Sequence, residues 1–199
     1  LNKINIKAFK IGSGECNNYP FVEYIAKKKK PIILSTGMND LKQISRTVKI
    51  FEKYRIPFAL LHCTNIYPTP FNLVRLNCLE ELRKKFKNAV IGLSDHTTTN
   101  HTSLAAVALG ARILEKHFTD SKKRKGPDIS CSMDPNDLKD LIIGSKNIFN
   151  ALKGKKKHLL QERKTSKFAF GSIVAIKDIF PNEILTKKKI FTKRPGTGY

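Results

Sequence analysis

Two histidines in this chain lie where a pair of metal ligands would be expected. His96 and His117 stand at the ends of two consecutive apolar runs, around residues 89–93 and 112–118. If these runs are neighbouring strands about 4.8 Å apart, both imidazoles can reach one ion. Imidazole suits Mn, Fe, Co or Zn, and carboxylates with water would complete a site for Mn or Mg. Spacing alone also allows two unrelated histidines, one held by a hydrogen bond and one at the surface.

A carboxylate accompanies the second histidine. Glu115 precedes His117 by two positions, so both point to the same face of an extended strand. A carboxylate inside a folded domain is costly unless it pairs with a cation or binds a metal. The position of Glu115 therefore favours a role in the same site.

A second group of side chains has the composition of an anion site. One lysine, several hydroxyls and an amide can hold a small phosphorylated anion, because they supply a point charge and several donors. Each of these residues alone is also typical of a turn, a helix cap or a solvated lysine. Their shared position after apolar runs is what indicates one site. The group is Lys10, Ser13, Glu15, Ser35, Asn65, Tyr67 and Ser94.

A further acidic residue follows the last apolar run of the first part of the chain. Asp128 ends a Gly-Pro-Asp sequence beside the basic run 122–125. This sequence is typical of a simple turn. As a functional residue, Asp128 would accept hydrogen bonds from sugar hydroxyls.

The elements that must position these residues are strands alternating with helices. Such alternation every 25 to 30 residues is typical of a parallel sheet. Asp40 and Asn136 are the expected helix caps. The expected strands are 4–11, 31–34, 58–62, 89–93 and 112–118, and the expected helices are 20–28, 40–54, 70–86, 99–109 and 135–152.

Two α/β architectures fit this alternation, a doubly wound sheet and a (β/α)8 barrel of the TIM type. The polar residues follow nearly every run, and barrels gather catalytic residues from many strand ends at one face. A doubly wound sheet concentrates its site at one switch point instead. We therefore expect a barrel that lacks about three βα units ahead of Leu1, in line with the absence of an initiating Met.

The sequence changes character after the last expected helix. We expect a partial barrel over 1–152, a linker over 153–167 and a truncated small β domain over 168–199. Residues 172–176 and 189–192 have strand character, with a turn between them. About 30 residues rarely bury enough surface to fold alone.

The formal net charge of +22, from 38 basic and 16 acidic residues, raises the possibility of a nucleic-acid or membrane-surface partner. The excess is mostly lysine, whereas arginine is the better ligand for phosphates and base edges. We therefore expect no nucleic-acid role, and a non-catalytic basic binding fragment stays as the alternative of another class. No apolar run approaches the roughly 20 residues that span a bilayer. The four cysteines form no CxxC pair, which indicates reduced thiols in a cytoplasmic protein.

Several strings resemble the bacterial N-acetylneuraminate (sialic acid) synthase family, in order and over nearly the whole chain. The strings are FKIGSGECNNYP (9–20), PIILSTGM (31–38), LLHCTNIYPTP (60–70), GLSDHTTTNH (92–101), ILEKHFTD (113–120), GPDISCSMDP (126–135) and KRPGTG (193–198). The family has a (β/α)8 barrel followed by a small antifreeze-like β domain, the SAF domain. The resemblance implies a domain-swapped homodimer when the protein is full length.

The resemblance also implies roles for single residues. His96 and His117 would bind the metal, Mn or Mg. Glu15 and Glu115 would handle protons. Phosphoenolpyruvate would be held by Lys10, Ser13, Ser35, Asn65 and Ser94, while Glu15, Tyr67, Glu115 and Asp128 would face the sugar, and Arg194, with Phe168 nearby, would reach the partner's sugar site.

The implied reaction condenses phosphoenolpyruvate with N-acetylmannosamine to give N-acetylneuraminate and phosphate. Legionaminic, pseudaminic or spore-coat sugar synthases, which perform the same condensation, are alternatives. The three βα units absent ahead of Leu1 would carry further site residues. We therefore expect the chain alone to be inactive or poorly soluble, because an open barrel exposes strand edges.

Overall fold

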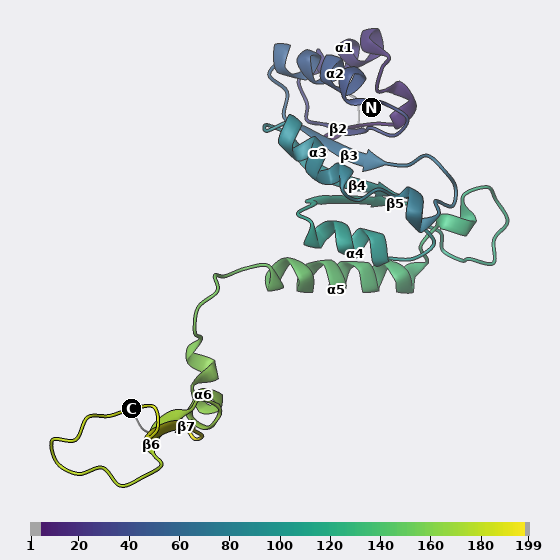
Figure 1. Ribbon diagram of the computed structural model, residues 1–199. Helices are drawn as coiled ribbons and strands as arrows, with labels where there is room; N and C mark the ends of the chain where they lie inside the picture. The colour runs from purple at the N-terminus through teal and green to yellow at the C-terminus, as the bar shows by residue number, and fades with distance from the viewer. Residues whose placement is uncertain (1–4, 198–199) are drawn as a thin grey trace. The chain divides into compact units, whose positions relative to one another are not determined.

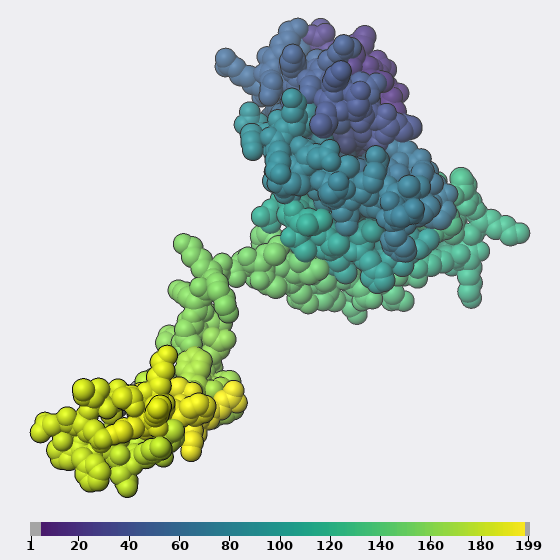
Figure 2. Space-filling model, viewed as in Figure 1, coloured from purple at the N-terminus to yellow at the C-terminus, as the bar shows by residue number. Residues whose placement is uncertain are grey.

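The computed structural model describes residues 5–197, so Ile4 of the first expected strand lies outside the described residues. The chain divides into two compact units, Leu1–Lys153 and Gly154–Tyr199, and each is described by itself. Figure 2 shows the first unit, coloured from purple to green, as a continuous body of packed atoms.

The first unit is built on a five-stranded sheet whose strands are all parallel and lie in chain order. Sequential parallel strands with helical crossovers are the repeating unit of a barrel. This half-barrel confirms the predicted TIM-type α/β fold. The strands are β1 (Phe9–Ile11), β2 (Ile32–Ser35), β3 (Phe58–Cys63), β4 (Val90–Asp95) and β5 (Ile113–Lys116).

Side-chain alternation separates the two faces of this sheet. The register places Ser35 beside Leu61, and Cys63 beside Ser94 and Ser94 beside Glu115, so these side chains share one face. We call it the concave face. The opposite face is apolar and forms the core with the helices; its strand residues are Phe9, Ile11, Ile32, Leu34, Phe58, Leu60, Ile91 and Leu93.

Five helices accompany the sheet (Figure 1). Helix α3 packs on β3 and β4, α4 packs on β4, and α5 packs on α4. Across residues 5–197, no helix is both long enough and apolar enough to cross a membrane. The helices are α1 (Tyr19–Ala26), α2 (Leu41–Lys53), α3 (Cys78–Lys85), α4 (His101–Ala108) and α5 (Pro135–Ala151).

Local chemistry explains where these helices begin. Asp40 caps α2 as predicted, in a reciprocal capping box with Gln43. The predicted cap Asn136 is wrong, because Asp134 caps α5 and its carboxylate accepts from the Asn136 amide. Helix α3 begins well after residue 70, since Arg75 has a φ of +55° and interrupts the helical path.

The second unit is smaller and carries little buried surface. It contains a 3-10 turn (Leu160–Glu162), α6 (Arg163–Ala169) and an antiparallel pair, β6 (Ser172–Ala175) and β7 (Ile190–Lys193). The range 153–167, expected as linker, thus includes the turn and most of α6. Many large apolar side chains of this unit are exposed, among them Phe168, Phe180, Ile184 and Phe191.

Candidate active site

Polar side chains from opposite edges of the sheet meet on the concave face. The Lys10 ammonium on β1 donates to Ser35 Oγ at 2.9 Å and lies 3.4 Å from the Glu115 carboxylate on β5. Ser94 donates to the other carboxylate oxygen of Glu115 at 2.9 Å. Four predicted site residues therefore form one connected chain of contacts, with a cation, a carboxylate and two hydroxyls.

The loops after β1, β2 and β3 contribute further polar groups beyond the strand ends. Ser13 is buried, and its Oγ accepts from the Gly37 amide at 3.0 Å. A Cβ at Gly37 would overlap the amide oxygen of Asn65, so only glycine allows this approach. Asn65 in turn donates to the Tyr67 hydroxyl at 3.5 Å. The loops after β1, β2 and β3 are thus packed against one another at the mouth of the half-barrel.

The two histidines lie side by side, with ring centroids 5.1 Å apart. Tyr67 contacts both rings, at centroid distances of 4.1 Å from His96 and 5.7 Å from His117. Asp128 lies on the outer side, with a carboxylate oxygen 3.6 Å from Nδ1 of His117. The structure therefore brings the predicted pair together with two residues predicted to face the sugar.

Backbone groups orient the first histidine. Nδ1 of His96 donates to the Thr64 carbonyl at 3.1 Å, because a carbonyl can only accept, and this leaves Nε2 with the free lone pair. The His96 carbonyl accepts from the Thr69 amide at 2.9 Å. Burial lowers the pKa of His96, with the neighbouring His117 acting in the same direction. A neutral imidazole with one free nitrogen is the form that binds a metal.

These donors would make only a partial set of metal ligands. Within residues 5–197, no three His, Cys, Asp or Glu side chains are arranged to hold an ion together. His96 and His117 fit as two adjacent imidazole ligands, and water, substrate oxygens or further carboxylates would complete the coordination. The chemistry of the pair fits a divalent metal.

Three predicted residues stand apart from these contacts. Glu15 is exposed and accepts from Asn18 at 2.6 Å. Phe168 and Arg194 belong to the second unit, where both are exposed. The contacts described above are therefore made without these three residues.

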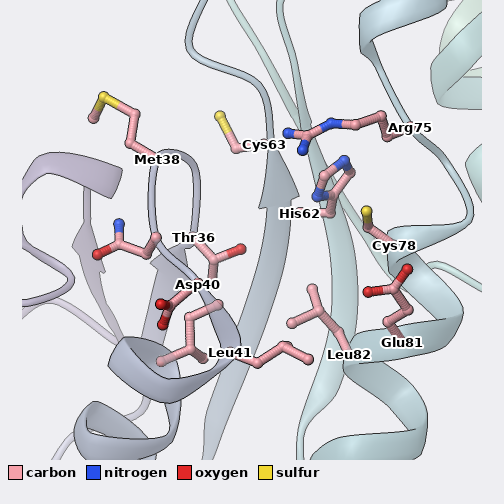
Figure 3. A pocket seen from close by; sticks show the side chains of 12 residues that line it. Thr36, Met38, Asp40, Leu41, His62, Cys63, Arg75, Cys78, Glu81 and Leu82 are labelled. Carbon is pink, nitrogen blue, oxygen red and sulfur yellow. The ribbon is translucent and has the colours of Figure 1, made fainter.

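A cleft of about 410 Å³ lies near the ends of β2 and β3, between α2 and α3 (Figure 3). His62, Arg75 and Cys78 line one side, and Met38 and Asp40 line the other. None of the predicted site residues lines this cleft. His62, which lines the cleft, donates to the Val74 carbonyl at 2.7 Å. This bond holds the loop that carries Asn65.

Several residues that shape the site were not predicted. Thr64 and Thr69 act on His96 through backbone groups, which no side-chain pattern reveals. Asp95 and Lys116 form a buried ion pair directly before the two histidines. The sequence offered one indication of this pair, because a charged residue directly precedes each of the two histidines.

Known proteins resemble this chain in sequence and in fold. A family model described as the NeuB family matches residues 1–157. An N,N′-diacetyllegionaminic acid synthase of Campylobacter jejuni is 45% identical over the whole chain, and the human N-acetylneuraminate-9-phosphate synthase is 34% identical over 98% of it. A solved N-acetylneuraminic acid synthetase of Leptospira borgpetersenii superposes on 83% of the chain with a TM-score of 0.78 and 33% identity.

The chain is shorter than these relatives. It spans 60% of the Campylobacter jejuni protein, 55% of the human protein and 58% of the Leptospira chain.

Proposed function

The chain belongs to the NeuB family, and we propose on that premise that the complete protein joins phosphoenolpyruvate to an N-acetylated amino sugar. The observation that carries the proposal is the contact between Lys10 and Glu115 across the concave face, beside the histidine pair. This arrangement supplies a cation for an anionic substrate and a carboxylate for proton transfer. The first candidate sugar is N-acetylmannosamine, and the products are N-acetylneuraminate and phosphate.

We assign the phosphoenolpyruvate site to the chain of contacts on the concave face. Lys10 provides the point charge, and the hydroxyls of Ser13, Ser35 and Ser94 lie at or near the strand ends around it. Asn65 adds an amide donor from the loop after β3. Charge-assisted hydrogen bonds of this kind are the stronger class and favour a phosphate or carboxylate.

We assign His96 and His117 as two ligands of a divalent metal, Mn or Mg. When bound, such an ion supplies Lewis-acid polarisation of the aldehyde of the open-chain sugar. The Thr64 carbonyl holds the His96 ring in the tautomer whose Nε2 is free. Tyr67 and Asp128 flank the pair and are the residues that would contact the sugar hydroxyls.

The proposed condensation forms one C–C bond and breaks the C–O bond to phosphate. C3 of phosphoenolpyruvate forms a bond to the aldehyde carbon, and the aldehyde oxygen takes up a proton as the new hydroxyl. Water then adds to C2 and gives up one proton. The C2–O bond to phosphate breaks as the new hydroxyl becomes the C2 ketone, and its proton leaves with the phosphate. Glu115, which lies within the chain of contacts, accepts the proton from water. Lys10 and the hydroxyls would hold the phosphate while the bond breaks.

We propose that the second unit belongs to an antifreeze-like β domain. Its antiparallel pair and many exposed apolar side chains support this assignment. In a full-length homodimer, Arg194 and Phe168 of one subunit would then complete the sugar site of the other. Sedimentation of the full-length protein would test the dimer.

A second candidate sugar is the precursor of N,N′-diacetyllegionaminic acid. The 45% identity to the Campylobacter jejuni synthase of that acid favours it. The two candidates differ only in the sugar, so both use the same assignments for Lys10, His96 and His117. Competition between the two sugars for one enzyme distinguishes them by kcat/KM.

The experiment measures phosphate release from phosphoenolpyruvate with each sugar in turn. The chain is assayed alone and as a chimaera completed with the part of the Campylobacter jejuni relative that it does not match. We expect no turnover by the chain alone and sugar-dependent turnover by the chimaera. The chimaera carrying Lys10→Met and the unmatched relative segment alone are the controls. A folded chimaera that releases no phosphate with either sugar would contradict the proposal.

A further inference from the structure

An ion pair is buried on the helix side of the sheet, directly behind the histidine pair. The Lys116 ammonium lies 3.2 Å from the Asp95 carboxylate, and their side chains are 2% and 1% exposed. Removing two charges from water costs several kcal/mol per ion, so such a pair adds little net stability. A structural role in holding the core together is therefore a weak explanation for its presence.

The carboxylate of Asp95 is hydrogen-bonded by several further groups. One oxygen accepts from the Thr102 and Ser103 hydroxyls, each at 2.7 Å, and the other accepts from the Thr97 amide at 2.9 Å. Thr102 and Ser103 belong to α4. The end of β4 is therefore fixed to the helix behind it.

The ammonium of Lys116 also holds the residue that follows His96. Lys116 donates to the Thr97 carbonyl at 2.5 Å as well as to Asp95. Asp95 precedes His96 and Thr97 follows it, so both neighbours of His96 are held by one buried network. A shift of the β5 end relative to the β4 end would break these bonds.

The register of the sheet links this buried network to the positions of the two histidine rings. Asp95 and Lys116 are direct partners across β4 and β5. Their successors along the chain are His96 and His117, and successive strand side chains point to opposite faces. A pair locked on the helix side thus places the next pair opposite each other on the concave side, as the 5.1 Å between the ring centroids shows.

We propose that the Asp95–Lys116 ion pair is a positioning device that holds the imidazoles of His96 and His117 at the separation a shared metal requires. The inference deepens the proposed function, because it rests on the assignment of those histidines as metal ligands. Asp95 and Lys116 are buried on the helix side of the sheet, opposite the concave face. Both act through the strand ends.

Two readouts test the inference in the chimaera described above, because the chain alone is expected to be poorly soluble. The first is the contact between the His96 and His117 rings, seen as a nuclear Overhauser effect with labelled histidine and without metal. The second is the affinity for Mn²⁺, measured by electron paramagnetic resonance. His96→Ala and His117→Ala assign the ring signals, and the far-ultraviolet circular dichroism melt of each variant reports folding.

The principal variant is Lys116→Met, which removes the cation and keeps a long side chain. We expect it to lose the ring contact and to bind Mn²⁺ about 10- to 100-fold more weakly, the usual range when the groups supporting metal ligands are changed. Lys116→Arg keeps a cation and is expected to restore both readouts at least in part. Asp95→Asn, which keeps the shape but removes the charge, repeats the test if Lys116→Met does not fold.

The matched control is Lys53→Met, which removes the lysine of the Lys53–Glu23 ion pair between α2 and α1, away from the histidines. We expect it to leave the ring contact and Mn²⁺ affinity unchanged. The inference is overturned if a folded Lys116→Met or Asp95→Asn chimaera keeps the ring contact, or keeps Mn²⁺ affinity within about threefold of wild type. If these variants lose the ring contact while even the wild type binds no Mn²⁺, the positioning role stands and the proposed metal site fails.

Discussion

The ammonium of Lys10 lies 3.4 Å from the carboxylate of Glu115, although the two residues belong to β1 and β5, the first and last strands of the sheet. In a flat sheet with strands about 4.8 Å apart, these strands would be about 19 Å from each other. Two extended side chains would not bridge that gap. The contact therefore records how strongly the half-barrel curls, and it encloses the polar concave face.

Replacing Lys10 by Met should weaken phosphoenolpyruvate binding. A hydrogen bond to a charged group contributes about 1.5–3 kcal/mol, so we expect a roughly tenfold to hundredfold loss of affinity in calorimetric titration of the active chimaera. Lys7→Met is the matched control, because Lys7 is an exposed lysine ahead of the same strand. An equal loss in Lys7→Met would show that only the overall charge matters.

Either histidine substitution should abolish tight Mn²⁺ binding. His96→Ala and His117→Ala each remove one of two adjacent imidazole ligands, and binding is followed by titration with electron paramagnetic resonance detection. His101→Ala serves as control, since His101 is exposed at the start of α4. Unchanged affinity in His96→Ala would remove His96 from the metal site.

A methyl group at position 37 should destabilise the loops at the mouth of the half-barrel. The added Cβ of Gly37→Ala would overlap the Asn65 side chain and approach Ser13 Oγ to 3.0 Å. Overpacking of this kind costs about 1–3 kcal/mol, measured as the free energy of unfolding in urea. Gly14→Ala is the control, because a Cβ there meets nothing within 4 Å. Equal stability of the two variants would contradict the close packing of Gly37 and Asn65.

Acid should destabilise the fold through His62. Burial lowers the pKa of His62 below 6.5, so the unfolded chain takes up a proton more readily than the folded chain. The stability that the neutral side chain contributes is present above 6.5 and is lost as the pH falls from 6.5 to the folded pKa. Each unit of pKa difference corresponds to about 1.4 kcal/mol.

The measurement compares urea unfolding of the wild type with that of His62→Gln, well above and well below pH 6.5. Other groups titrate equally in both proteins, so the difference between them isolates His62. We expect the wild type to lose more stability on acidification than the variant. Parallel pH profiles would show that His62 is not held neutral by burial.

Much of the architecture could be predicted because the strands and helices carry different periodicities. The five apolar runs contain β1 to β5 to within a few residues, and the polar residues at their ends could be assigned to one face. The start of α3 could not be predicted, because the positive φ of Arg75 comes from the loop and not from a turn residue such as glycine.

Within the site, too, some contacts could be predicted from the sequence and others could not. Glu115 and His117 could be predicted to share one face, because side chains two positions apart in a strand point the same way. The Thr64 carbonyl that orients His96 could not be foreseen, since every residue has a carbonyl. Asp95 and Lys116 were missed because a charged residue in a strand is usually expected to face solvent, whereas these two neutralise each other behind the sheet.

Because side chains alternate between the two faces of the sheet, the sequence at one face can change independently of the other. The residues that build the helix-side core and those that line the concave face occupy different positions of the same strands. Substitutions that alter which sugar is accepted can therefore accumulate at one set of positions while the other set keeps the chain folded. Such separability fits a scaffold that is shared by relatives named as synthases of different sugar acids.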